Sequence, residues 1–325
     1  MKRAVATTRA PGSLPILIGV LLLACDGDSS TPAACPEADA YDVDTLKDDV
    51  FYLASPHLDG RFPGSDGDYS ARAFIANRFA CLGLTPLESS DWYEQPFVDE
   101  AGDETGNVIG YLPGSDSEVA SDIILVSAHH DHLGDGHLGA NDNASGVSGL
   151  LAIAQDFMSG PAPARTVIFA AFGAEESGFE GSEYFMSHPP DDFDPSDIVY
   201  NINMDMIGSY SEAGEVWALG ALEGTEGRAL VEANASLHPD LEVGLDEPSD
   251  QSDNVSFCER GIPYIFFWTE DEACYHETCD TADRVDYESL SDIAQLTGEV
   301  AMDLANSDED LRAAVTPDSN VCEGP

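Results

Sequence analysis

Basic residues are scarce in this sequence. Its 325 residues include only 12 Lys and Arg against 62 Asp and Glu, which gives a formal net charge of -50 at pH 7. A surface this negative repels the phosphate backbone of nucleic acids and anionic lipid headgroups, so we expect no nucleic-acid partner. A solvated acidic surface without a specific role is the simplest explanation of so many acids, and scattered Ca²⁺ sites are the functional alternative.

The sequence also lacks an apolar run long enough to span a membrane. Residues 14–24 are apolar but fall short of the roughly 20 residues that a transmembrane helix needs. They follow three basic residues, as in a signal peptide, and end in Leu22-Leu23-Ala24-Cys25, which resembles a bacterial lipobox. An ordinary signal peptide that happens to end near a cysteine is the alternative interpretation.

We therefore predict an exported cell-envelope lipoprotein on the periplasmic or surface side of a membrane. Residues 1–24 would be the signal peptide, Cys25 would carry the lipid anchor, and the Ser-, Pro-, Ala- and acid-rich residues 25–40 would form a flexible tether. Residues 41–306 are expected to form a single domain that acts as a monomer, followed by an acidic tail at residues 307–325.

No pair of cysteines has CxxC spacing, which disfavours a zinc site built from four cysteines. Six of the seven cysteines follow Cys25, and an even number in an exported protein suggests disulfide bonds. Cys274 and Cys279 bracket Tyr275 and His276, so a local bridge between them would stiffen that loop.

Strand and helix patterns alternate along the domain. The expected strands are residues 107–112, 123–127, 166–172, 198–204, 216–219 and 263–268. A helical pattern begins at residues 44–45, and further helices are expected at residues 69–82, 147–158, 182–186, 227–235, 254–259 and 289–304. This order predicts an α/β fold, with a mostly parallel mixed β-sheet sandwiched between helices.

Residue types that bind metal ions follow several of these strands, and ligands collect at the carboxyl ends of strands in open α/β sheets. His129 comes directly after one strand, with Asp131 placed to orient its imidazole and His132 as a competing ligand. A histidine-rich surface turn is the alternative. Asp142 lies among small residues before the next helix and could bridge two ions, although Asn143 or Ser145 could simply cap that helix.

Five more residues complete the candidate site. Glu175 and Glu176 follow another strand, so one could bind metal while the other accepts a proton from water; a solvated acidic turn is the alternative. Asp205 interrupts an apolar run, where an unpaired carboxylate would be costly. The loop between Cys274 and Cys279 supplies His276 and the hydroxyl of Tyr275. Trp268 could line an apolar pocket or belong to the core, and the same holds for Phe257 and Tyr264.

Together these segments resemble the co-catalytic zinc exopeptidases of metallopeptidase family 28 in clan MH, which have a phosphorylase/hydrolase-like fold. The resemblance spans residues 46–304 and includes an opening loop at residues 60–64. Its specific parts are Ala128-His129-His130-Asp131, Ala140-Asn141-Asp142-Asn143-Ala144-Ser145-Gly146, Gly173-Ala174-Glu175-Glu176, Asn203-Met204-Asp205-Met206-Ile207-Gly208 and Cys274-Tyr275-His276.

The resemblance implies two Zn²⁺ ions per chain, with the metal ligands His129, Asp142, Glu176, Asp205 and His276. His129 and Asp205 would hold one ion and Glu176 and His276 the other, with Asp142 between them. The catalytic residues would be Glu175 as general base, Asp131 as the group that orients His129, and Tyr275 as a stabiliser of the oxyanion.

The expected function is a zinc-dependent exopeptidase. Acidic groups near the site favour a substrate with a free N-terminus, and hence an aminopeptidase, because a carboxypeptidase needs a cation for the α-carboxylate and the site loops carry almost no Lys or Arg. The alternatives are a glutaminyl cyclase-like transferase, which shares the fold but typically works with one zinc, and a non-catalytic envelope binding module on the same scaffold.

Overall fold

A computed structural model describes residues 39–88, 92–245 and 249–312. The contacts within the chain define two units, Met1–Thr31 and Pro32–Pro325, and every described residue belongs to the second. The expected signal peptide, the lipid anchor and most of the tether therefore lie outside the described residues. Within the described ranges, no helix combines the length and the apolar character needed to cross a membrane.

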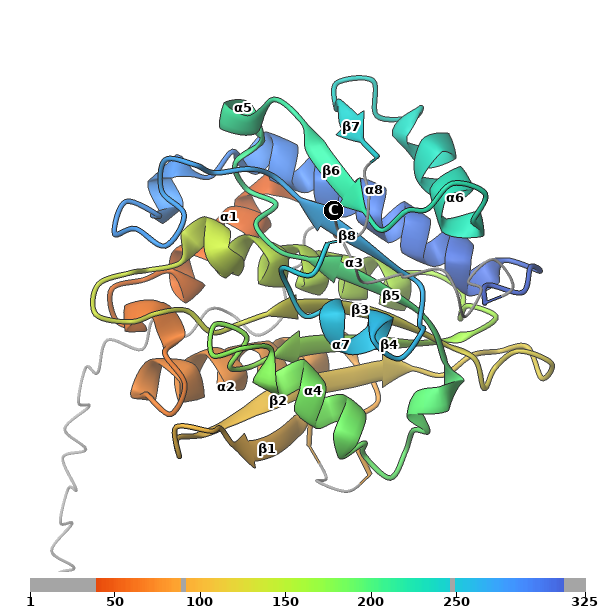
Figure 1. Cartoon of the computed structure of the whole chain (residues 1–325), viewed down its shortest axis with the longest axis horizontal. Coiled ribbons are helices and arrows are strands. Elements are labelled where there is room, and N and C mark those ends of the chain that lie inside the picture. The colour runs from red at the N-terminus through yellow and green to blue at the C-terminus, as the bar shows by residue number, and fades with distance from the viewer. Residues whose placement is uncertain (1–38, 89–91, 246–248, 313–325) are drawn as a thin grey trace, which may run out of the picture. The chain divides into compact units, whose positions relative to one another are not determined.

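An eight-stranded mixed sheet runs through the described residues (Figure 1). Its spatial order is β1-β2-β4-β3-β5-β8-β6-β7. The strands are β1 (Glu94–Val98), β2 (Glu104–Leu112), β3 (Ile123–His129), β4 (Thr166–Phe172), β5 (Ile198–Met204), β6 (Val216–Leu219), β7 (Val243–Gly244) and β8 (Tyr264–Trp268). The central strands β4, β3, β5 and β8 are mutually parallel, whereas β2 and β6 pair with their central neighbours in the antiparallel sense.

Helices cover both faces of this sheet, which confirms the predicted α/β class (Figure 1). Buried side chains of α1, α2, α3 and α8 share the larger hydrophobic core with one face, and those of α4 and α7 pack on the other. The helices are α1 (Val43–Leu53), α2 (Asp66–Leu82), α3 (Gly146–Ser159), α4 (Glu180–Ser187), α5 (Tyr210–Ala213), α6 (Glu226–Ala235), α7 (Val255–Cys258) and α8 (Tyr287–Asn306).

Local sequence signals explain where most elements begin and end. α2 begins three residues earlier than its apolar pattern predicts, because the Ser65 hydroxyl accepts a hydrogen bond from the Asp68 amide at 3.1 Å. It ends at Gly83, whose φ of 84° is the left-handed conformation that glycine adopts without strain. The sequence did not predict β1, which is short and contains Pro96, or the two-residue strand β7.

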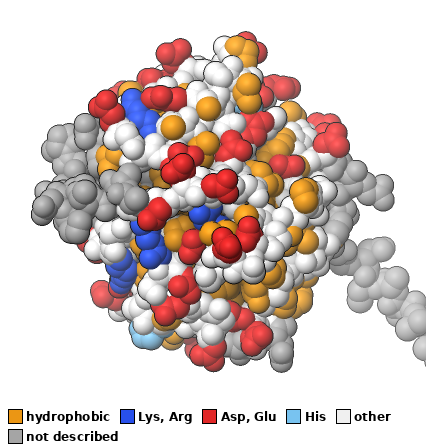
Figure 2. Space-filling model, turned by 90° about the vertical axis from the view of Figure 1, so that its right-hand side faces the viewer, with side chains coloured by type: hydrophobic (Ala, Val, Ile, Leu, Met, Phe, Trp, Pro, Cys, Tyr) orange, Lys and Arg blue, Asp and Glu red, His pale blue; other side chains and the backbone are white. Residues whose placement is uncertain are grey.

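Acidic side chains are spread over the face of the molecule in Figure 2, with only small groups of Lys and Arg among them. This distribution agrees with the strongly negative composition.

α3 leads directly out of the segment that carries Asp142, and its buried side chains belong to the hydrophobic core. Its packing should therefore matter for stability. Leu150 of α3 is fully buried, so Leu150→Ala should lower the free energy of unfolding by about 2–5 kcal/mol. Urea denaturation followed by circular dichroism measures the change. The same substitution at Leu237, which is 68% exposed, should change it by less than about 0.5 kcal/mol, and equal losses at both positions would contradict this description of the core.

Candidate metal centre

The side chains that the sequence singled out converge at one edge of the sheet. β3 ends at His129, and the irregular helical segment Ala140–Ser145 (η2) brings Asp142 back toward the same strand end. Glu175 and Glu176 follow β4, and Asp205 follows β5. His276 lies in the loop after β8. Because these four strands are parallel neighbours, their carboxyl ends face the same side.

One group of ligand atoms surrounds the imidazole of His129. Its Nε2 atom lies 3.1 Å from Oδ1 of Asp205 and 3.2 Å from Oδ1 of Asp142. All three side chains are buried, and their ligand atoms lie close enough together to bind one ion.

A second group surrounds the imidazole of His276. Its Nε2 atom lies 3.0 Å from Oε2 of Glu176 and 3.2 Å from Oδ2 of Asp142. His132 approaches the same group from the β3 side, with Nδ1 at 2.6 Å from Oε1 of Glu176 and 3.7 Å from Oδ2 of Asp142. Asp142 therefore presents one carboxylate oxygen to each group, which is the arrangement expected of a carboxylate between two ions.

The chemistry of these residues fits divalent cations. Burying several carboxylates without positive charge is costly, and Asp142, Glu175 and Asp205 are all less than 10% exposed. Oδ2 of Asp142 and Nε2 of His132 are buried and have no hydrogen-bond partner among the described residues. The described part of the chain contains no other group of three potential ligands at such spacing, so the expectation of further Ca²⁺ sites remains a prediction.

Asp131 does more than the orienting role that the sequence suggested. Its carboxylate lies 3.7 Å from Nδ1 of His129, and its backbone oxygen is closer to that atom, at 3.2 Å. The two carboxylate oxygens also accept hydrogen bonds from the amides of Glu175, at 3.0 Å, and Glu176, at 3.3 Å. Asp131 thus connects the loop after β3 to the loop after β4. These contacts could not be predicted from the sequence because they join residues more than 40 positions apart.

Polar side chains around Asp142 fix its loop against the loop after β5. Oδ1 of Asn143 accepts hydrogen bonds from the amides of Gly146, at 2.9 Å, and Met206, at 3.2 Å. The first of these bonds occupies the amide of Gly146, the first residue of α3, whereas the N-cap residue Ser145 makes no side-chain capping bond. Oδ1 of Asn141 accepts from the Gly208 amide at 2.8 Å and so adds a second connection to the same loop.

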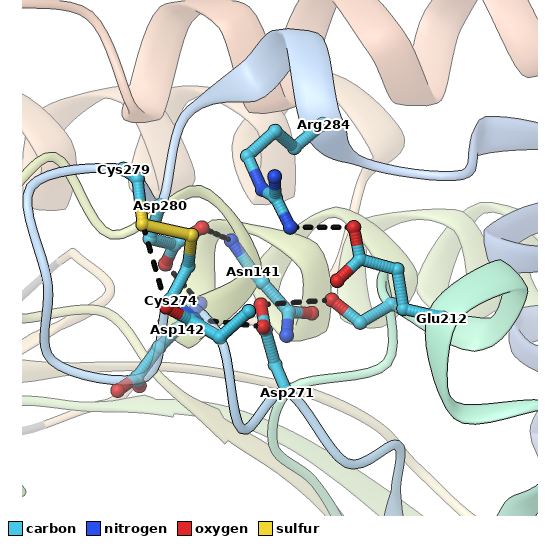
Figure 3. The surroundings of a disulfide bond; sticks show 10 residues. Asn141, Asp142, Glu212, Asp271, Cys274, Cys279, Asp280 and Arg284 are labelled. Atoms are coloured by element: carbon cyan, nitrogen blue, oxygen red, sulfur yellow. Dashed lines mark hydrogen bonds and ion pairs between the residues drawn. A yellow bond between two sulfur atoms is a disulfide. The ribbon is translucent and has the colours of Figure 1, made fainter.

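The disulfide loop positions both Asp142 and His276. Cys274 and Cys279 are bonded to each other as predicted, with their Cα atoms 5.4 Å apart. Cys81 and Cys258 each also take part in a disulfide bond. Asp280, the next residue, accepts hydrogen bonds from the amides of Asn141, at 2.8 Å, and Asp142, at 3.0 Å (Figure 3). Asp280 was not predicted from the sequence, although its position directly after Cys279 places it beside the loop of His276.

A cavity of about 440 Å³ opens beside the metal-ligand groups. Glu175, Asp205 and His276 line one part of it, and apolar side chains line another, namely Met206, Phe266 and Trp268. Tyr275 lies at the cavity with 53% of its surface exposed. Of the three aromatic residues considered from the sequence, only Trp268 lines the cavity, whereas Phe257 and Tyr264 are fully buried in the core. Among the described residues, no Lys or Arg lines this cavity.

The protonation of two groups at the cavity is shaped by their surroundings. Burial raises the pKa of Glu175 well above its usual range, while the imidazole of His129 opposes that rise. Partial burial, reinforced by the carboxylate of Asp142, raises the pKa of Tyr275 to about 12. The Tyr275 hydroxyl therefore stays protonated at neutral pH and is able to donate a hydrogen bond.

The fold and the site together define a candidate metal-binding α/β protein. Overlapping groups of potential metal ligands lie at the carboxyl ends of its parallel strands. The model of Peptidase family M28 matches residues 107–301, and the chain belongs to this family. The matched region contains His129, Asp142, Glu176, Asp205 and His276.

Individual proteins are also similar to parts of this chain. Aminopeptidase YwaD of Bacillus subtilis is 33% identical over 187 residues, which are 54% of this chain but only 39% of that protein. The solved structure of BSAP, a zinc aminopeptidase from Bacillus subtilis, is 27% identical with a TM-score of 0.56 and covers 65% of this chain and 54% of its own. A glutaminyl cyclase from Porphyromonas gingivalis has a TM-score of 0.67 at 18% identity, covers 81% of this chain and 99% of its own, and shares the fold alone.

Removing the charge of Asp280 should loosen the loop that presents Asp142. In Asp280→Asn, one carboxylate oxygen becomes an NH₂ group that faces a backbone N–H, so we expect a roughly 10- to 100-fold weaker affinity for Zn²⁺. Competition with a chromophoric chelator measures this. Asp194→Asn is a matched control, because Asp194 also accepts from a backbone amide but lies before β5, away from the site. Equal Zn²⁺ affinity in Asp280→Asn and the wild type would show that Asp280 does not support the centre.

Proposed function

We propose that this protein is a zinc-dependent aminopeptidase that holds two Zn²⁺ ions and removes N-terminal residues from peptides. The position of Asp142 carries the proposal, because its two carboxylate oxygens each lie 3.2 Å from the Nε2 atom of a different histidine. His129 and Asp205 would hold one ion, and Glu176 and His276 the other. Imidazole nitrogens and carboxylate oxygens are ligands that zinc accepts in catalytic sites.

When bound, the zinc ions would act as Lewis acids and make water a better nucleophile at neutral pH. Glu175 lines the cavity next to this position and would accept the proton of the attacking water, then return it to the leaving amine. The protonated hydroxyl of Tyr275 would donate a hydrogen bond to the oxyanion that develops on the peptide carbonyl. The carboxylate of Asp131 keeps Glu175 in place by accepting a hydrogen bond from the backbone amide of Glu175.

The charges at the cavity support recognition of an amino group rather than a carboxylate. Glu270, Asp271 and Glu272 line the cavity together with the proposed metal ligands, and the described part of the lining includes no Lys or Arg that would bind an α-carboxylate. The apolar wall of Phe266, Trp268 and Met206 offers a surface for the side chain of the N-terminal residue. Peptides with a free N-terminus are therefore the proposed substrates.

Two other functions fit the same fold. A glutaminyl cyclase-like transferase has a specific observation in its favour, since the fold extends to a cyclase, but two ligand groups that share Asp142 support two ions rather than one. A non-catalytic binding module would not need Glu175 in the cavity beside the ligands.

Replacing the proposed base should separate binding from chemistry. Glu175→Gln keeps the shape of the side chain but does not accept a proton, so we expect kcat to fall roughly 10²- to 10⁴-fold with the bound zinc retained. Steady-state kinetics and metal analysis of the same sample measure both quantities. Glu277→Gln, an exposed change next to His276, is the matched control and should leave kcat unchanged. Undiminished turnover in Glu175→Gln would remove Glu175 as the base.

Substrate profiling with metal counting tests the function itself. We expect about two Zn²⁺ per chain, release of N-terminal residues from free-amine aminoacyl-nitroanilides, no turnover of their N-acetylated forms, and loss of activity with a chelator that added Zn²⁺ reverses. About one Zn²⁺ per chain with cyclisation of N-terminal glutamine would favour the transferase. Cleavage of N-blocked peptides from the C-terminus would establish a carboxypeptidase, and zinc binding without turnover of any of these substrates would favour a binding module.

We further propose that the protein is exported and anchored to the cell envelope by a lipid on Cys25. The lipobox-like residues 22–25 support this location. So does the Cys274–Cys279 bond, because disulfides persist in oxidising compartments.

A further inference from the structure

The opening loop of the family resemblance contains Arg61, which has no part in the proposed chemistry. Its side chain is completely buried, and its contacts are to backbone carbonyl oxygens. Nε donates to the oxygen of His130 at 2.6 Å, and Nη2 donates to that of Gly139 at 2.9 Å. Nη1 donates to the oxygens of Leu53, at 2.6 Å, and Leu138, at 2.9 Å.

These bonds join the two segments that carry the first ligands. His130 directly follows His129, and Gly139 directly precedes the segment Ala140–Ser145 that carries Asp142. The bond to Leu53 fastens the same guanidinium to the end of α1, which packs in the core. A planar fork of five N–H donors fixes the directions of its partners in a way that a flexible ammonium does not.

The approach of this loop to the ligand segment is close enough to restrict the neighbouring residue. Gly60 has a φ of 74°, and a Cβ atom there would lie 2.3 Å from the backbone oxygen of His137. Only glycine fits directly before Arg61. This close approach of the loop lets the Arg61 guanidinium reach the backbone of residues 130–139.

Arg61 also supplies positive charge to a region that is rich in buried carboxylates. Burial lowers its pKa to about 10, while the charges of Asp131, Asp280 and Asp142 oppose that decrease. The guanidinium thus remains charged at neutral pH, and it reduces the repulsion among carboxylates that the ligand loops bring together.

We propose that Arg61 is a positioning residue for the metal centre, which holds His129 and Asp142 at ligand spacing before the ions bind. The inference rests on the proposed metal-dependent function. A residue that only stabilised the fold would affect unfolding but not the Zn²⁺ affinity of the folded protein.

Arg165 provides the matched control. It is also buried, and it also donates to backbone carbonyl oxygens, those of Leu304, Ser307 and Glu309, but these lie at the end of α8 and beyond it. Substitutions at Arg61 and Arg165 therefore remove similar sets of hydrogen bonds. Only the hydrogen bonds of Arg61 connect the ligand loops.

The experiment compares Arg61→Lys, Arg61→Met, Arg165→Lys and Arg165→Met in the full chain. Each protein is stripped of metal, and its Zn²⁺ affinity is measured by chelator competition at a temperature where circular dichroism shows it to be folded. Arg61→Lys should bind Zn²⁺ about tenfold more weakly than the wild type, and Arg61→Met more weakly still because it also loses the charge. Both Arg165 variants should unfold at lower temperature with unchanged Zn²⁺ affinity.

If the Arg61 variants bound Zn²⁺ as tightly as the wild type, the inference about Arg61 would be wrong and the proposed function would stand. If the wild-type chain bound no Zn²⁺, both the inference and the proposed function would be wrong. Hydrogen exchange of the metal-free wild type covers the case in which the Arg61 variants do not fold. The amides of residues 130–142 should be protected without Zn²⁺ if Arg61 holds them in place. Free exchange that becomes slow only after Zn²⁺ is added would also overturn the inference.

Discussion

The carboxylate of Asp142 lies between two imidazoles, with one oxygen 3.2 Å from His129 and the other 3.2 Å from His276. This arrangement brings carboxylates close to one another. Asp205 approaches the imidazole of His129, and Glu176 approaches the imidazole of His276. Buried carboxylates at such spacing destabilise a fold unless positive charge or hydrogen-bond donors compensate them. The local structure around the site supplies that compensation through imidazoles, backbone amides and, in the proposed function, bound cations.

The parallel part of the sheet makes this convergence possible. β4, β3, β5 and β8 are neighbours, and each delivers at least one functional side chain from its carboxyl end. Antiparallel strands run in alternating directions and would send half of these ends to the opposite edge. The antiparallel strands β1, β2 and β6 lie outside this central group and carry none of the proposed ligands among the described residues. The fold thus separates a parallel region that builds the site from outer strands that complete the sheet.

The proposed ligands and the orienting residue Asp131 are recognisable from the sequence, whereas Asp280 and the contacts of Arg61 are not. His129, Glu175 and Asp205 were recognisable because metal chemistry restricts the residue types and because each follows an apolar strand. Asp280 and Arg61 bind the ligand loops through hydrogen bonds to backbone groups 69 to 139 positions away, and such partners are set by tertiary packing and leave no local pattern. Strand β1 was not predicted from the sequence for a different reason, because Pro96 and its short length are atypical of a strand.

The fold alone does not choose among the activities that it supports, because an aminopeptidase and a glutaminyl cyclase both resemble it. The choice therefore depends on charge at the site. In the proposed function, cations offset the carboxylates that act as ligands, but Glu270 and Glu272 at the cavity are not part of either ligand group. Their negative charge remains after the metal is bound, and it favours the protonated amine of a peptide over its carboxylate. In the proposed function the acidic residues thus have two roles: those at the strand ends would bind the metal, and those at the cavity would select the end of the substrate.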